Sequence, residues 1–423
     1  MKDLKYFCSH LFTSLSFDHA GRVRVCCNNY EVPTGEDLEP INVYSEDFDV
    51  KKAFNSDLHN RIRKNILNNK QDESCIRCWQ TEDNGADSYR TIWNSTLASG
   101  YLRGIMLDSV NDDGEIDKPF TTFLDFTMGN KCNLVCRMCN LQNSNQWDLE
   151  SDLLGLDIEG FESSTTLEVD KKFLSDEFFV KNFMHLKQVN FLGGEPLIIK
   201  EHYEFLKKCI KFGVAPKMIL SYTTNLTVIK KELKDLWKCF RHVSVGVSLD
   251  AIGPLNDYIR YPSKWNVITK NLLKLSKFRN EVSMDIQIHS TFQLLNVLDW
   301  GELFDWTYSL SDLGVWRVPF PNWLTHPSYY DCRILSDELK QDAIDRITKS
   351  IESKSDTEWT DGEKQWLGIL DSNLKTMQER LDEGLELDSR HKLQHYTKLL
   401  DMNRDQSITK INPKLAEFIY EKL

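Results

Sequence analysis

Short apolar runs recur through the middle of the chain, and amphipathic segments of ten or more residues separate them. Apolar runs bounded by polar or glycine-containing turns predict strands, and longer segments with helical spacing predict helices. From residue 121 onward the pattern therefore predicts strands that alternate with helices. The expected strands cover residues 121–128, 188–192, 218–222, 243–249, 283–289 and 315–319.

The helices predicted between these strands begin at about residue 133 and cover 200–212, 228–240, 265–278 and 297–308. Strands that alternate with helices of this length predict βαβ units and a parallel sheet. Residues 1–103 read as irregular with short strand-like pieces, 108–118 as an acidic linker, and 151–185 as a charged insertion. From Ser336 the pattern is helical and polar, so we expect this part to pack outside the central fold.

Composition adds modest constraints on the kind of protein. The 423 residues are 41% hydrophobic and 27% charged, as in an ordinary globular protein, and the length favours more than one domain. A net charge of −12 argues against a protein that wraps duplex nucleic acid. The first fifteen residues lack the pattern of a signal peptide, and no apolar run reaches the ~18 residues of a membrane helix. We therefore expect a cytoplasmic protein without a membrane partner.

Cysteine spacing carries the strongest chemical signal. Without a secretory signal, closely spaced cysteines predict metal or cluster ligands rather than disulfides. The sequence Cys132-Asn133-Leu134-Val135-Cys136-Arg137-Met138-Cys139 places three thiols at C-x3-C-x2-C, and a closed structural zinc site would need a fourth ligand. Of the eleven cysteines, four more lie in the pairs Cys26/Cys27 and Cys75/Cys78, whereas Cys209, Cys239 and Cys332 read as small hydrophobic residues.

Polar or small residues follow four consecutive predicted strands. In barrel folds, functional groups gather where each strand ends and its loop begins. The shared position of these residues is stronger evidence for a site than any one of the motifs alone. The first strand is followed by the three cysteines, the second by Gly193-Gly194-Glu195-Pro196, the third by Asn225, and the fourth ends at Ser248-Leu249-Asp250.

Together these motifs resemble the radical S-adenosylmethionine (SAM) enzymes, in which three cysteines hold a [4Fe–4S] cluster that binds SAM through its fourth iron. The resemblance implies a partial (β/α)6 barrel over residues 119–320, preceded by a cysteine-rich domain at 1–107 and followed by a mostly helical region at 321–423. It also implies SAM contacts. The amino group of SAM would be received by Gly193, Gly194 and Glu195, and its carboxylate would pair with Arg260. The ribose or methionine part would contact Asn225, Ser248 and Asp250. Near the adenine, Met138 replaces the usual aromatic residue.

An upstream set of thiols resembles the SPASM and twitch domains that bind auxiliary Fe–S clusters. Its members are Cys8, Cys26, Cys75 and Cys78, and Cys27 is an alternative to Cys26. The usual domain follows the barrel, whereas here it precedes it, as in an uncharacterised group of twitch-type radical SAM proteins. A zinc ribbon remains the alternative, because four thiolates suit zinc as well as iron.

The resemblance implies an enzyme that reductively cleaves SAM with an external one-electron reductant and abstracts hydrogen from a substrate. Enzymes with such domains often modify peptides, so a peptide or protein is the favoured substrate. The expected class of enzyme is an oxidoreductase or a peptide-modifying enzyme. Two alternatives remain open at this point: the same chemistry on a nucleotide or sugar, and a non-catalytic scaffold stabilised by zinc.

Overall fold

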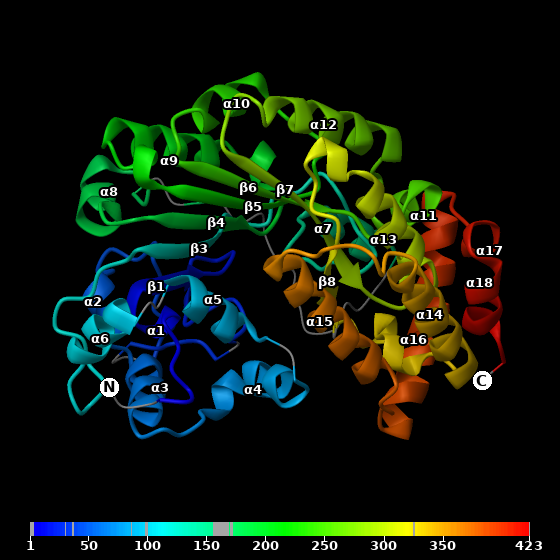
Figure 1. Ribbon diagram of the computed structural model, residues 1–423, viewed down its shortest axis with the longest axis horizontal. Coiled ribbons are helices and arrows are strands. Elements are labelled where there is room, and N and C mark those ends of the chain that lie inside the picture. Colours follow the sequence, from blue (N-terminus) through cyan, green and yellow to red (C-terminus); the bar gives the residue numbers. More distant parts are fainter. Residues whose placement is uncertain are drawn as a thin grey trace. The chain divides into compact units, whose positions relative to one another are not determined.

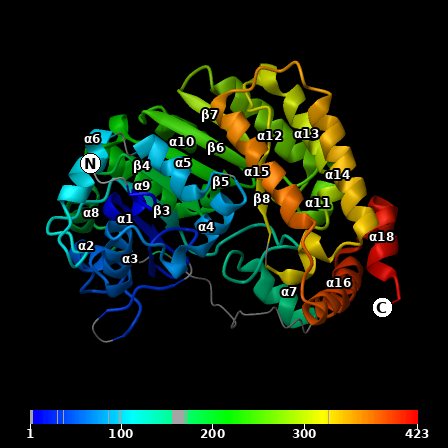
Figure 2. The same cartoon turned by 60° about the horizontal axis from the view of Figure 1, so that its bottom comes forward.

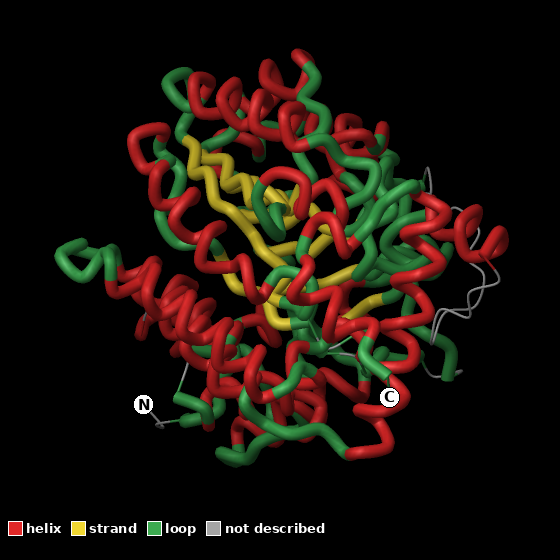
Figure 3. The backbone as a smooth tube through the Cα atoms, turned by 90° about the vertical axis from the view of Figure 1, so that its right-hand side faces the viewer, coloured by secondary structure: helices red, strands yellow, loops and turns green. Residues whose placement is uncertain are grey.

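The computed structural model describes residues 4–29, 31–35, 38–85, 87–97, 100–154, 169, 172–324 and 326–422. It shows an α/β fold with one eight-stranded sheet, in the order β2-β1-β3-β4-β5-β6-β7-β8 (yellow in Figure 3). The sheet is mostly parallel, and the antiparallel β2 forms one edge. The chain divides into two compact units: unit 1 comprises 1–131, 166–222 and 230–243, and unit 2 comprises 132–165, 223–229 and 244–423.

In unit 1 the N-terminal region is folded rather than irregular, which corrects the sequence expectation. Its strand β1 pairs in parallel with β3, so this region extends the sheet. The error arose because the helices here are short and separated by polar turns, and each gains its stability from tertiary burial rather than from a long periodic pattern. The elements are α1 (His10–Thr13), β1 (Ser14–Phe17), β2 (Val23–Arg24), α2 (Val50–Phe54), α3 (Asp57–Leu67), α4 (Ile76–Asp83), α5 (Tyr89–Leu97) and α6 (Gly100–Asp108).

Strands β3 to β5 carry aromatic side chains on one face, which α9 covers. Phe205 of α9 lies 6.0 Å from Phe126 and 5.9 Å from Phe191, measured between ring centroids. Helix α5 lies on the opposite face (Figure 1). The ring centroid of its Trp93 is 4.5 Å from that of Phe123. The remaining elements of unit 1 are β3 (Phe123–Thr127), α8 (Asp176–Phe183), β4 (Gln188–Leu192), α9 (Lys200–Lys211) and α10 (Lys231–Trp237). The strands β5 (Ile219–Thr224) and β6 (His242–Ser248) begin in unit 1 and end in unit 2.

Unit 2 has a large apolar core shared between the last strands and the C-terminal helices, and a smaller apolar cluster around Trp147 and Leu400. Helices α13 and α14 lie side by side, and α15 packs on β8 (Figure 2). The helical region expected from Ser336 is confirmed. Its elements are α7 (Gln146–Leu154), α11 (Gly253–Ile259), α12 (Trp265–Phe278), β7 (Met284–Phe292), α13 (Trp300–Ser309), β8 (Phe320–Trp323), α14 (Asp337–Glu352), α15 (Asp361–Met377), α16 (Glu383–Arg404), α17 (Ile408–Ile411) and α18 (Pro413–Tyr420).

The 3₁₀ turns fill the gaps between these elements. They are η1 (Glu73–Cys75), η2 (Pro196–Ile198), η3 (Ala215–Lys217), η4 (Val297–Asp299), η5 (Ser311–Leu313), η6 (Ser328–Tyr330) and η7 (Cys332–Ile334).

The predicted strands at 121–128, 188–192, 218–222, 243–249 and 283–289 are confirmed with small shifts at their ends. The strand predicted at 315–319 is wrong: only Val315 makes an isolated bridge there, and the strand β8 begins at Phe320. The acidic stretch at 108–118 folds back on itself through a bridge between Val110 and Ile116. Much of the insertion predicted at 151–185 lies outside the described residues. Of the helices that the structure describes, none has the length and apolar character to cross a membrane.

Candidate functional site

The loop that carries the three cysteines belongs to unit 2 and is not helical, which corrects the helix predicted from about residue 133; α7 begins only at Gln146. The loop backbone pairs instead with the segment after α11. The Val135 amide donates to the Tyr261 carbonyl at 2.7 Å, and the Arg137 amide donates to the Ile259 carbonyl at 2.8 Å. Amides that bond to a distant segment in this way are not available to a helical ladder. Tertiary pairing therefore overrides the local helix signal.

The thiols of this loop lie in a desolvated setting. Cys136 is buried, and Cys132 and Cys139 are half-buried. Burial raises the pKa of Cys139 to about 12 and also raises the pKa of Cys136, while the Arg260 cation acts on both thiols in the opposite direction. Within the described part of the chain, no three His, Cys, Asp or Glu side chains are already arranged around a common metal position. The donor set, three soft sulfur atoms on one loop, fits an iron–sulfur cluster chemically.

Arg260 and Asp250 form a buried ion pair beside these thiols. The Arg260 Nη2 donates to Asp250 Oδ1 at 3.1 Å, and the Arg260 Nε lies 2.8 Å from Asp250 Oδ2. Asp250 Oδ1 also accepts from the Thr291 amide at 2.8 Å. Both side chains had been predicted to contact SAM, and the structure shows them paired with each other. A bound carboxylate would therefore have to share the Arg260 guanidinium with Asp250.

Of the other predicted residues in unit 2, Asn225 contacts the same loop. Asn225 donates to the Asn133 side chain at 3.0 Å, and Asn133 in turn donates to the Thr227 hydroxyl at 2.8 Å. This link ties the cysteine loop to the end of β5. Ser248 is buried at the end of β6, and Met138 packs partly buried against the core of unit 2.

In unit 1, the Gly-Gly-Glu segment follows β4 and turns sharply. Gly193 and Gly194 both have positive φ, at 70° and 46°. A Cβ atom on Gly194 would lie 2.4 Å from the Lys131 carbonyl oxygen, so glycine is needed here by the packing of the chain itself. Glu195 is buried, and its carboxylate accepts from the Leu197 amide at 3.0 Å, which caps the 3₁₀ turn η2.

Also in unit 1, the structure brings the four upstream thiols together. Burial and the nearby thiols together raise the pKa of Cys8 and of Cys75 to about 12, with burial as the larger cause; Cys78 acts on Cys8, and both Cys8 and Cys78 act on Cys75. Burial likewise raises the pKa of Cys78. One small cavity is lined by all four predicted ligands, Cys8, Cys26, Cys75 and Cys78.

Cys27, the alternative ligand, has a different set of neighbours. Its thiol interacts with the Tyr89 hydroxyl and the Asp125 carboxyl. Tyr89 donates to Asp125 Oδ2 at 3.2 Å, and Asn190 donates to Oδ1 at 2.8 Å. Cys26 is among the residues that line the cavity, whereas Cys27 interacts with both this polar group and the Cys78 thiol.

Sequence reasoning missed a polar row that crosses unit 1. Ser16, Asp125, Asn190 and Ser221 are aligned partners on β1, β3, β4 and β5. Burial raises the pKa of Asp125 to about 6. The signal was present as polar residues in the middle of apolar strands, but only the register of the sheet shows that they form one line.

Residues 126–288 match the family model of the Radical SAM superfamily. This region contains the cysteine loop, the Gly-Gly-Glu segment and the Asp250–Arg260 pair. The match supports a radical SAM domain over these residues. No curated protein sequence matches the chain.

Solved structures give more distant similarities. Native anSMEcpe with bound AdoMet has a TM-score of 0.38 and 13% identity, over 55% of this chain and 61% of that one. Streptococcus suis SuiB bound to S-adenosylmethionine has a TM-score of 0.34 and 16% identity, over 74% and 64%. SuiB bound to the precursor peptide SuiA has a TM-score of 0.35 and 17% identity, over 65% and 60%. The chain thus spans less than two thirds of each of these proteins.

Proposed function

We propose that this protein is a radical SAM enzyme whose cluster is held by Cys132, Cys136 and Cys139. The observation that carries the proposal is the loop of three thiols inside the region that matches the superfamily. A bound [4Fe–4S] cluster would pass one electron from an external reductant to SAM, and SAM would then cleave to methionine and a 5′-deoxyadenosyl radical. This radical would abstract hydrogen from the substrate.

The protein's own residues have the roles of binding and orientation. Three thiols leave one iron without a protein ligand, which is the position that SAM requires. Arg260 places a cation beside two of the thiols and is the proposed partner of the SAM carboxylate, sharing its guanidinium with Asp250. We further propose that Gly193, Gly194 and Glu195 receive the amino group, that Asn225, Ser248 and Asp250 face the ribose or methionine, and that Met138 lies near the adenine.

We propose that Cys8, Cys26, Cys75 and Cys78 hold a second iron–sulfur cluster, in a domain of the SPASM or twitch type. Their shared cavity supports a common metal, and four thiol ligands would make that cluster an electron carrier rather than a substrate ligand. Zinc is the competing occupant. Metal analysis of protein purified without oxygen, combined with Mössbauer spectroscopy of ⁵⁷Fe-labelled protein, separates the two: one zinc per chain without a second iron cluster would contradict this assignment.

For the substrate, we propose a peptide or protein, on the basis of the sequence resemblance. A nucleotide or sugar is the competing class. Mass spectrometry of small molecules and peptides that copurify with the protein distinguishes these classes, because only a peptide gives a fragmentation ladder of amino-acid residues.

The test of the main proposal is the formation of 5′-deoxyadenosine. Protein reconstituted with iron and sulfide without oxygen is reduced and given SAM, and is compared with a variant in which Cys132, Cys136 and Cys139 are all replaced by alanine. Cys239→Ala serves as the matched control, because Cys239 is exposed and lies outside the three cysteine groups. Product in the wild type and the control but not in the triple variant supports the proposal. A wild type that binds zinc, holds no iron and forms no product would favour a scaffold.

A further inference from the structure

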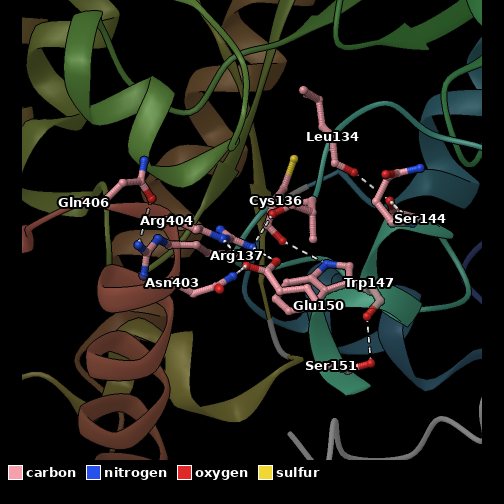
Figure 4. Close-up of polar contacts among 12 residues, drawn as sticks. Leu134, Cys136, Arg137, Ser144, Trp147, Glu150, Ser151, Asn403, Arg404 and Gln406 are labelled. Atoms are coloured by element: carbon pink, nitrogen blue, oxygen red, sulfur yellow. Dashed lines mark hydrogen bonds and ion pairs between the residues drawn. The ribbon is translucent and has the colours of Figure 1, made fainter. Parts of the chain in front are cut away.

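Side chains hold three carbonyl groups of the cysteine loop, and two of these side chains come from the helices α7 and α16. The Leu134 carbonyl accepts from the Ser144 hydroxyl at 2.6 Å. The Val135 carbonyl accepts from Arg404 Nη2 at 2.8 Å, and the Cys136 carbonyl accepts from Trp147 Nε1 at 3.2 Å (Figure 4). Three consecutive carbonyls are thus fixed by side chains, and one of these side chains lies at the end of α16, more than 260 residues along the chain.

Arg404 reaches the loop as half of a buried ion pair. Its side chain has no exposed surface, and Glu150 of α7 is 9% exposed. The Arg404 Nε donates to Glu150 Oε1 at 2.7 Å and Nη2 to Oε2 at 2.5 Å, while Asn403 donates to the same carboxylate at 2.9 Å. Two parallel bonds of this kind fix the plane of the guanidinium, and this plane directs Nη2 to the Val135 carbonyl.

A second ion pair joins α16 to the loop one turn earlier. Arg137, which lies between the second and third cysteines, is fully buried and donates to Asp401 at 2.7 Å and to Gln406 at 3.0 Å. Its guanidinium also stacks 3.6 Å from the centre of the Tyr258 ring. Asp401 and Arg404 are three residues apart on one helix, so both project from the same face. We name Arg137, Glu150, Asp401 and Arg404 the loop clamp.

Burying the charged groups of the loop clamp carries a desolvation penalty, so stability alone does not explain why the clamp is present. Two buried ion pairs seldom stabilise a protein more than apolar side chains of the same size would, but they specify one arrangement of the groups that they join. Here each pair is joined to the backbone or to a side chain of the cysteine loop. These contacts have the character of the outer interactions that orient metal ligands in other sites.

We propose that the end of α16 is a positioning element for the cluster: through the loop clamp it holds the cysteine loop in the conformation that binds and retains iron. This inference rests on the proposed function, because it assumes that the loop carries a cluster. Loss of an outer-shell partner typically costs 10- to 100-fold in metal affinity. We therefore expect Arg404→Gln to release iron from the SAM-responsive cluster at least about tenfold faster than the wild type.

The experiment uses the full chain, reconstituted with iron and sulfide and reduced with dithionite without oxygen, because only the reduced cluster gives a paramagnetic signal. The cluster is identified by the change that SAM causes in its electron paramagnetic resonance spectrum, and the decay of that signal is followed after addition of an iron chelator. Arg404→Lys is measured beside Arg404→Gln, because lysine keeps the charge but cannot form the two-pronged contact with Glu150. We expect Arg404→Lys to fall between the wild type and Arg404→Gln, and it also provides a folded variant if Arg404→Gln does not fold.

Arg317→Gln is the matched control, because Arg317 forms an ion pair with the buried Glu363 in the same unit without contacting the cysteine loop. Its melting temperature should fall while its rate of iron release stays at the wild-type value. Wild-type release rates in both Arg404 variants would overturn the inference, as would equally fast release in Arg317→Gln, which would indicate a general effect of stability. A wild type without any SAM-responsive cluster would instead overturn the proposed function, and the inference with it.

Discussion

At the scale of single residues, the motifs of this chain serve its own packing as well as any ligand. The Gly-Gly-Glu segment was chosen from sequence because glycine permits a ligand to approach the backbone. The structure adds that Gly194 leaves room for the Lys131 carbonyl. Similarly, Asp250 and Arg260 were predicted separately as SAM contacts, and they form a pair in the fold. Residue types were thus predictable, whereas their partners were not.

Gly194→Ala tests the packing requirement. The added methyl group would lie 2.4 Å from the Lys131 carbonyl oxygen, and the positive φ of 46° adds strain. We expect the free energy of unfolding to fall by about 2–4 kcal/mol, measured by urea denaturation. Gly213→Ala is the control, because Gly213 has a φ of 72° with nothing within 4 Å of the added atom. It should lose only about 1 kcal/mol. Equal losses in the two variants would show that the contact with Lys131 is unimportant.

At the scale of elements, the start of α15 is fixed by both a cap and a charge. Thr360 and Glu363 form a capping box, and the Glu363 carboxylate also accepts from the Arg317 Nε at 2.8 Å. Burial alone would raise the pKa of Glu363, but the bonds from Arg317 and Thr360 outweigh it and lower the pKa to about 2. This carboxylate therefore joins the helix to the segment before β8.

Glu363→Gln should reduce the free energy of unfolding by about 1–3 kcal/mol at pH 7, because the amide of glutamine cannot accept all of these bonds. The pKa of Glu363 in the folded protein lies below its ordinary value of 4.5. The stabilisation by this carboxylate is therefore present above pH 4.5 and is lost as the pH falls toward 2. Urea denaturation at several pH values should show the difference between variant and wild type narrowing in this window. Asp371→Asn, whose ion pair with Lys375 is exposed, should show little change at any pH. A difference that stays constant down to pH 2 would contradict the assigned role of the charge.

At the scale of the whole molecule, the fold consists of two compact units, each with its own buried core. Phe54 is fully buried in unit 1, and Leu415 is fully buried in unit 2. Replacing either with alanine should cost about 2–5 kcal/mol. Because each residue belongs to a different compact unit, we expect each change to weaken mainly its own unit.

Hydrogen–deuterium exchange followed by mass spectrometry measures this directly. Phe54→Ala should speed exchange in peptides of residues 1–131, and Leu415→Ala in peptides of residues 244–423. Uniform acceleration across both units in either variant would show that the chain unfolds as a single cooperative body.

The sequence by itself determined the local features of this protein. The central strands and helices follow from short-range periodicity, and the C-x3-C-x2-C spacing places three thiols on one loop wherever that loop lies. Tertiary structure decided what depends on distant partners. It folds the N-terminal region onto the sheet, replaces the helix expected at residue 133 with a loop, and gathers the four upstream thiols around one cavity. It also brings Arg404 to the carbonyl of Val135. A buried charge gives no periodic signal, so neither the arginine nor its role is visible until the chain has folded.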